Sequence, residues 1–110
     1  MICRIWRGWT TPENADAYHK ILTKEVMPEI AARKIEGLQS YQCMRRDMTG
    51  DDGQAEVEFT TIMYFDAISS VKKFVGDEYE KAHVPDKPRS VLKRFESHSK
   101  HYELFENIVL

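Results

Sequence analysis

The sequence lacks the features that mark several large classes of protein. No apolar run approaches the ~20 residues that a membrane-spanning helix needs, so no membrane partner is expected. The 16 basic residues are outnumbered by 18 acidic ones, and the net charge of −2 leaves no basic stripe for nucleic acid. Residues 1–11 contain arginines where a secretory signal has an uninterrupted apolar core. A cytoplasmic location is therefore the default expectation.

Cysteine is scarce, and no metal or phosphate motif is present. Cys3 and Cys43 are too few for a disulfide scaffold and are not spaced as zinc ligands, so we interpret them as small apolar residues. His98 and His101 stand three apart in an expected strand, which points them to opposite faces. No glycine-rich loop follows a strand. The residue spacing therefore predicts neither a metal site nor a phosphate-binding loop.

The residues that are present suffice for one small domain. The chain has 110 residues, of which 42% are apolar, and this fits a single domain spanning 1–110 with one core. A chain this short buries only part of its surface, so association with a second copy would stabilise it.

Hydrophobic periodicity gives the order of the elements in the first half. Alternation predicts strands over residues 2–9, 37–47 and 55–65. An amphipathic helix begins at Thr11 and Pro12, and we expect a kink or break at Pro28, which has no amide hydrogen to donate.

The second half contains a second helix and a final strand. Asp66 is the expected N-cap of a helix over residues 67–75, which Gly76 ends. A short helical turn from Asp77 then leads to His83. Pro85 and Pro88 break the helix, residues 89–95 coil once more, and residues 95–106 form a polar strand.

This order predicts an α+β fold of the ferredoxin-like βαββαβ type, an antiparallel sheet with two helices on one face. In the third strand, Val57 to Phe65 in steps of two form a largely apolar face. Thr60, Ile62 and Tyr64 on the other face suit another subunit better than water. We therefore expect a homodimer that pairs through the open sheet face.

Three stretches carry a resemblance to a known family: WRGWTTPENADAY (6–18), TTIMYFDAISSVKKFVGDEYEKAH (60–83) and the closing aromatic strand. Together with the element order, they resemble the antibiotic biosynthesis monooxygenase family over nearly the whole chain. The resemblance implies a dimeric α+β barrel, with a cleft between sheet and helices in each subunit. It also implies oxygenation of an aromatic substrate by molecular oxygen, without metal or flavin.

A related branch of that family binds and degrades haem. Its site combines a first-strand asparagine, a third-strand tryptophan and a histidine at the end of the second helix. The corresponding positions here are Arg7, Phe65 and His83, so only the histidine matches and haem is disfavoured. The quinone-forming members hold a phenol with polar and aromatic residues, for which this chain offers Arg7, Tyr64, Tyr79 and His83.

His83 and Arg7 are the candidate catalytic residues. An imidazole that titrates near neutral pH can accept a proton from an acidic phenol, and the resulting anion can reduce oxygen directly. The alternative is that His83 only complements the dipole at a helix C-terminus. Arg7 is assigned to the helix-covered face, where it could stabilise an oxyanion. The alternatives for it are an internal ion pair with Glu58 or Glu103, or a side chain that reaches water.

Aromatic and apolar residues supply the candidate substrate-binding wall. Trp6 and Trp9 point to opposite faces, one to the cleft and one to the dimer seam, and both can serve in packing. The residues assigned to the ligand, which can equally be plain core, are Trp9, Phe59, Met63, Phe65, Phe74 and Tyr79. The leading hypothesis is a cofactor-independent monooxygenase that acts on a small aromatic or apolar molecule. The alternatives are a haem-binding or haem-degrading protein and a non-catalytic dimer that binds a small ligand.

Overall fold

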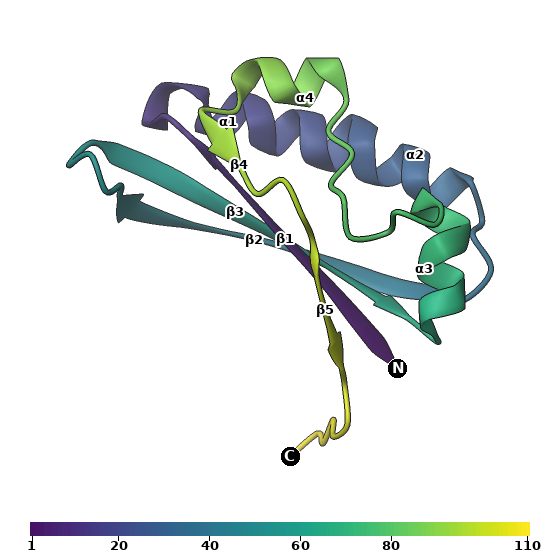
Figure 1. The fold of residues 1–110 in the computed structure, drawn as a ribbon. Coiled ribbons are helices and arrows are strands. Elements are labelled where there is room, and N and C mark those ends of the chain that lie inside the picture. The colour runs from purple at the N-terminus through teal and green to yellow at the C-terminus, as the bar shows by residue number, and fades with distance from the viewer.

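The computed structural model describes all residues, 1–110, and contains one antiparallel sheet covered by helices on one face (Figure 1). The strands follow the order β2-β3-β1-β4, and β5 also pairs with β1. They are β1 (Ile2–Thr10), β2 (Leu38–Thr49), β3 (Ala55–Phe65), β4 (Arg94–Phe95) and β5 (Lys100–Glu103). This order, with β1 and β3 in the centre, confirms the predicted ferredoxin-like α+β fold.

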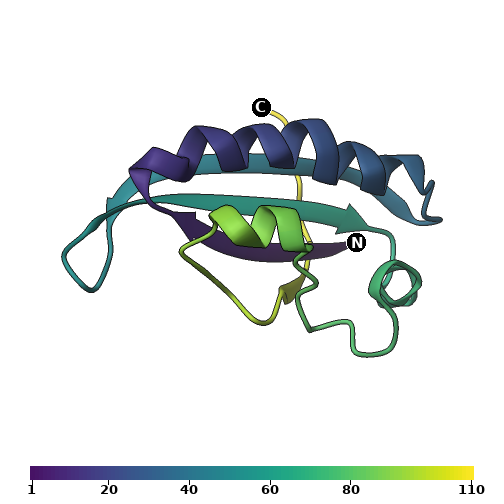
Figure 2. The ribbon, with the colours of Figure 1, turned by 90° about the horizontal axis from the view of Figure 1, so that it is seen from above.

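The first helical segment is one long rod that crosses the sheet. It consists of α1 (Pro12–Ile21), a π-helical turn over Leu22–Val26 and α2 (Met27–Ala32). Pro28 cannot donate to the Lys24 carbonyl. The helix widens just before it, and the Met27 amide bonds to the Leu22 carbonyl, five residues back. The predicted interruption is therefore a π turn rather than a break, and Figure 2 shows the rod continuing through it.

The second helical segment differs from the prediction in its details. Helix α3 (Ile68–Val75) has Ala67, not Asp66, at its N-cap, because the Asp66 carboxylate accepts a hydrogen bond from the Ser70 hydroxyl instead. Gly76 ends the helix as predicted, with a φ of 87° that favours glycine.

Residues 77–85 form a strap without a helix (hereafter the strap). The predicted short turn is present only as one hydrogen-bonded turn, in which the Lys81 amide donates to the Glu78 carbonyl at 3.1 Å. Lys81 pairs with His98 in an isolated β-bridge, and the Ala82 amide donates to the Ser97 carbonyl at 2.9 Å. Because residues 96–99 face the strap here, the predicted strand over 95–106 is split into β4 and β5. Helix α4 (Asp86–Val91) begins before Pro88, so that Pro88 lies in its first turn, whereas the sequence predicted a coil that begins only after Pro88. Helix α4 lies beside α1 in Figure 2.

The core lies between the rod and the helix-covered face of the sheet. The β3 face assignment is confirmed, since Val57, Phe59, Met63 and Phe65 are buried against the helices. Tyr18 meets Phe59 edge to face, with ring centroids 4.8 Å apart. The other buried members of this cluster are Ala15, Leu22, Met27, Ile30 and Val71.

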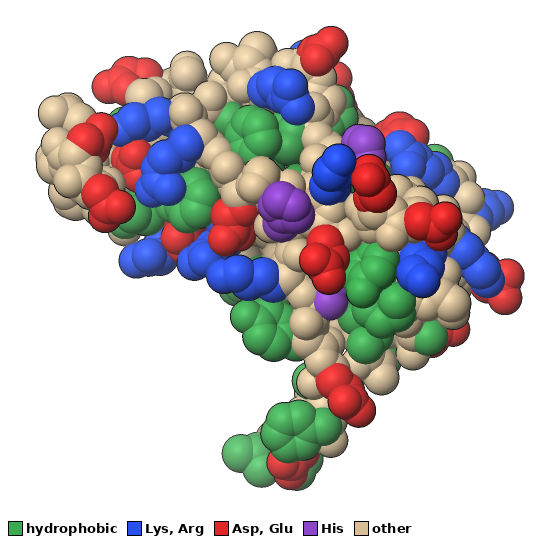
Figure 3. Space-filling view, in the orientation of Figure 1, with side chains coloured by type: hydrophobic (Ala, Val, Ile, Leu, Met, Phe, Trp, Pro, Cys, Tyr) green, Lys and Arg blue, Asp and Glu red, His purple; other side chains and the backbone are tan.

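The opposite sheet face carries no helix. Its inner strands present partly buried Cys3, Ile5 and Ile62, next to exposed Met44 and Tyr102. Beyond β5 the Leu104 amide donates to the Met1 carbonyl, and the C-terminal tail, residues 105–110, then stands clear of the body; Figure 3 shows apolar side chains along it. Its exposed apolar residues are Phe105, Ile108, Val109 and Leu110. None of the helices has the length and apolar content that crossing a membrane requires.

Candidate functional site

A cavity of about 100 Å³ lies between the rod, the sheet and the strap. We call it the inner cavity. An open groove of about 600 Å³, the outer groove, adjoins it along the rod and shares part of its lining. Phe74 and His83 belong to both, so the two spaces meet where α3 and the strap approach the rod.

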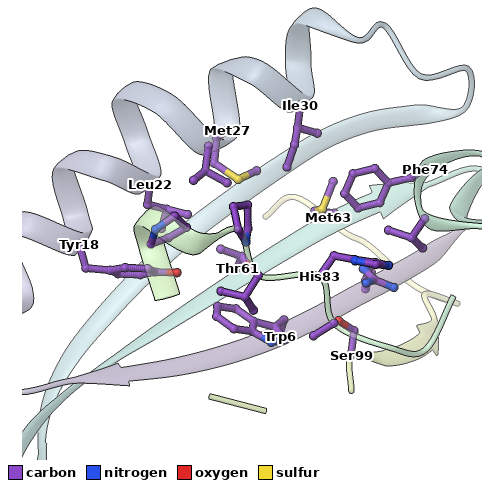
Figure 4. Close-up of a pocket in the computed structure, with 17 residues that line it drawn as sticks. Trp6, Tyr18, Leu22, Met27, Ile30, Thr61, Met63, Phe74, His83 and Ser99 are labelled. Atoms are coloured by element: carbon purple, nitrogen blue, oxygen red, sulfur yellow. The ribbon is translucent and has the colours of Figure 1, made fainter. Parts of the chain in front are cut away.

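The wall of the inner cavity is mostly apolar. Leu22, Met27 and Ile30 come from the rod, Met63 from β3 and Phe74 from α3 (Figure 4). Their spacing on the rod is that of a core stripe, and the π turn keeps the stripe facing the sheet. An apolar wall with a few polar groups is typical of small-molecule pockets.

Five polar side chains interrupt this wall: Arg4, Tyr18, Thr61, His83 and Ser99. They come from β1, the rod, β3, the strap and the segment before β5, so the fold brings together residues far apart in the sequence. No carboxylate lines the inner cavity. Its polar groups can therefore donate hydrogen bonds to a ligand but supply no negative charge.

Arg4 is the one charged group of the cavity that is buried. Its side chain lies under the strap, and the residue is 6% exposed. The Nη1 atom donates to the Tyr79 carbonyl and to His101 Nε2, the latter at 2.9 Å. Burial lowers the pKa of Arg4 to about 10, so the guanidinium remains charged at neutral pH.

Tyr18 places a hydroxyl inside the cavity. The residue is 2% exposed, and Figure 4 shows its oxygen directed between Thr61 and Trp6. Burial raises the pKa of this phenol well above its usual range, which keeps it protonated. It has no hydrogen-bond partner within the chain, so it is available as a donor to a ligand.

His83 lies at the mouth of the inner cavity, on the strap. It is exposed, and it has no hydrogen-bond partner within the chain. The sequence predicts a partly buried ring at the rim of the cleft, near Arg7 and Phe65. The ring does lie at the rim, but it is exposed, and Arg7 lies on the opposite face of the sheet. The alternative of a helix-capping histidine was wrong as well, because His83 lies between Gly76 and Asp86, outside any helix. It does line the cavity and the groove.

Arg7 lies on the other side of the sheet. Its cross-strand partner is Thr60, so it shares the open face, and its Nη2 pairs with Glu96 Oε2 at 3.0 Å. The prediction that Arg7 faces the helices was therefore wrong. Its ion-pair partner is Glu96, not Glu58 or Glu103. The error is one of strand parity: a shift of one residue exchanges the two faces. Arg4 occupies the position in the cleft that we had assigned to Arg7.

Trp9 was also assigned to the wrong face. It pairs with Glu58 on the open face, where the Arg94 guanidinium covers its ring at 3.8 Å. Arg94 and Lys93 in turn reach Glu56, each at 2.8 Å. Trp6 lines the inner cavity instead, and its Nε1 donates to the Glu96 carbonyl at 2.8 Å.

The remaining candidates divide between cavity and core. Met63 and Phe74 line the inner cavity, as expected. Phe59 and Phe65 are buried in the core behind it and do not reach the cavity surface. Tyr79 turns away from it, toward His101, with ring centroids 5.1 Å apart. The polar lining residues that sequence reasoning missed are Arg4, Tyr18, Thr61 and Ser99.

The topology and the cleft between sheet and helices define the class: this chain has the fold of the dimeric α+β barrel proteins. The sequence matches no protein-family model. It matches no curated protein either.

Two solved structures share the fold over nearly the whole chain. One is an ethyl tert-butyl ether (EthD) family protein from Bacillus halodurans C-125, with a TM-score of 0.58 and 17% identity, over 96% of this chain and 100% of that one. The other is a monooxygenase from the gene ActVA-Orf6 of Streptomyces coelicolor, in complex with the ligand nanaomycin D. Its TM-score is 0.54 and its identity 14%, over 99% of this chain and 90% of that one. The resemblance seen in the sequence is confirmed at the level of the fold.

Proposed function

We propose that the protein binds a small, largely apolar aromatic molecule in the inner cavity and outer groove and oxidises it with molecular oxygen, without metal or flavin. The observation that carries the proposal is the cavity itself. It is apolar, lies between sheet and helices, holds protein donors inside and has His83 at its mouth. The same fold in the Streptomyces monooxygenase is described with the ligand nanaomycin D.

The chemistry needs only a base and a site that excludes bulk water. His83 accepts the proton of an acidic phenol, and the resulting phenolate is electron-rich enough to reduce oxygen. Conversion of a phenol to a quinone by one O₂ places one oxygen atom on the ring and releases the other as water. The substrate supplies all the electrons, so no external reductant is required. Donors such as the Tyr18 hydroxyl hold the developing quinone oxygen.

The protein is proposed to act as a homodimer that pairs through the open sheet face. Three of the side chains on that face, Cys3, Ile5 and Ile62, are apolar and only partly covered, and the apolar tail extends from the same side of the sheet. Two such faces packed together would remove this surface from water. Light scattering at micromolar concentration should give the mass of a dimer, and a stable monomer would contradict the proposal.

A thermal-shift screen of phenols, quinols and haem, followed by oxygen uptake on each hit, tests the activity. We expect an apolar phenol to raise the melting temperature and to consume one O₂ per molecule oxidised. His83→Gln should abolish uptake and leave the melting temperature nearly unchanged, because the side chain is exposed and makes no hydrogen bond. His98→Gln, an exposed histidine outside the cavity lining, is the matched control.

The other outcomes identify the alternatives. Stabilisation by a phenol without any oxygen uptake would indicate a binding protein. A strong visible absorption band on titration with haem, lost in His83→Ala, would indicate a haem protein.

A further inference from the structure

Arg4 differs from the other arginines of the chain in having no acidic partner. Arginines 7, 33, 45, 46 and 94 each pair with a carboxylate at 2.8–3.2 Å. Arg89 has none but is exposed. Arg4 is therefore the one arginine that is both buried and without a counter-ion. A buried charge without a counter-ion is costly, and an anion from outside the chain would reduce that cost.

The unused part of the Arg4 guanidinium has a defined geometry. In arginines 7, 33, 46 and 94, the Nε and Nη2 atoms together hold one carboxylate, at distances of 2.8–3.5 Å. In Arg4 the same edge makes only a long contact, from Nη2 to the Lys81 carbonyl at 3.5 Å. Its Nη1 is already occupied by the Tyr79 carbonyl and His101. The edge that binds carboxylates elsewhere in this protein is thus available in Arg4.

This edge opens onto the inner cavity. Two side-chain polar atoms are fully buried and lack a hydrogen-bond partner: Trp9 Nε1 and Thr10 Oγ1. The Arg4 Nε atom also lacks a partner, but it is not among the enclosed atoms, so it borders accessible space. Because Arg4 is 6% exposed and lines the cavity, that space is the cavity. The same reasoning applies to the Tyr18 hydroxyl in a residue that is 2% exposed.

We infer that the ligand of this cavity is an aromatic acid whose carboxylate binds the Nε and Nη2 atoms of Arg4. A planar carboxylate matches the two parallel N–H groups of that edge and neutralises the buried charge. The apolar body of the ligand lies against Met27, Met63 and Phe74 and extends toward the outer groove. The inference rests on the proposed function only in using the same cavity. It names the class of substrate but does not require that oxygen be consumed.

Calorimetric titration of the full chain with 2-naphthoate and with 2-naphthamide, at pH 7.5, tests the inference. The two probes have the same shape and differ in charge. We expect the acid to bind at least tenfold more tightly than the amide. Arg4→Gln should abolish that preference. Arg7→Gln removes an arginine from the same strand but from the opposite face, and should retain it.

Arg4→Lys guards against a failure to fold, because a lysine keeps the charge but lacks the two-pronged edge. The acid preference should fall in Arg4→Lys while circular dichroism shows a folded protein. Equal affinity for the two probes, binding of neither, or a preference that survives in folded Arg4→Lys and Arg4→Gln would each overturn the inference. A protein that prefers the acid yet consumes no oxygen would refute the proposed oxidation and leave the acid site standing.

Discussion

Replacing Tyr18 by phenylalanine should stabilise the free protein and weaken ligand binding. The Tyr18 hydroxyl borders only the small inner cavity and has no partner within the chain, so on folding it loses part of the hydrogen bonding that it has with bulk water. Protein data place the cost of such a hydroxyl at roughly 1–3 kcal/mol, and contact with the cavity favours the lower end. We expect Tyr18→Phe to raise the free energy of unfolding by about 1 kcal/mol, or the melting temperature by roughly 4 °C.

The same substitution removes a donor from the proposed site. Loss of one neutral hydrogen bond to a ligand costs about 0.5–1.5 kcal/mol, which is roughly a two- to twelvefold weaker affinity. Urea unfolding measures the first effect, and calorimetric titration with the best phenol of the screen measures the second.

Tyr64→Phe is the matched control, because the Tyr64 hydroxyl donates to Gln42 at 3.0 Å on the open face. Tyr64→Phe should leave the free energy of unfolding unchanged or slightly lowered, and it should not alter the affinity for the phenol. A Tyr18→Phe protein that is less stable than wild type, or that binds the phenol with full affinity, would show that the hydroxyl has a partner other than the ligand.

Two further predictions concern pH and assembly. Burial and the charge of Arg4 lower the pKa of His101, so its neutral form contributes stability that is complete above the ordinary histidine value of ~6.5 and is lost as the pH falls through the lowered pKa. The melting temperature of His101→Gln should accordingly fall less between pH 7 and pH 5 than that of wild type or His98→Gln; equal slopes would rule out His101 as the titrating group. Deleting residues 105–110 should raise the dimer dissociation constant at least about tenfold, because burial of a single large apolar side chain contributes ~1.5–3 kcal/mol. An unchanged dissociation constant in analytical ultracentrifugation would exclude the tail from the interface.

The fold could be read from the sequence because its signals are redundant. The β3 face of Val57, Phe59, Met63 and Phe65 has one apolar side, and the helices around it carry matching stripes. Gly76 ends α3 at a φ of 87°, which few other residues adopt readily. Errors in the cap of α3 or in the strap did not alter the order of the strands.

The candidate site was less predictable, because it depended on the parity of a single strand. The residues of β1 that face the helices are Arg4, Trp6, Gly8 and Thr10, while the open face holds Cys3, Ile5, Arg7 and Trp9. The open-face set is the more apolar of the two, so a rule that buries the apolar face selects the wrong side. Tyr18 was missed for a related reason: its place in an apolar stripe correctly predicted its burial but gave no sign that its hydroxyl would reach a cavity.

The two arginines of β1 show what separates a structural charge from one that awaits a ligand. Arg7 and Arg4 are three residues apart, so the pleat places them on opposite faces of the same strand. The Arg7 guanidinium donates hydrogen bonds to the Glu96 carboxylate, which raises the pKa of Arg7 and neutralises both charges within the chain. Burial instead lowers the pKa of Arg4, whose partners are two carbonyls and an imidazole. Neutral partners hold the Arg4 side chain in place but leave its charge uncompensated, and an anion entering the inner cavity would compensate it.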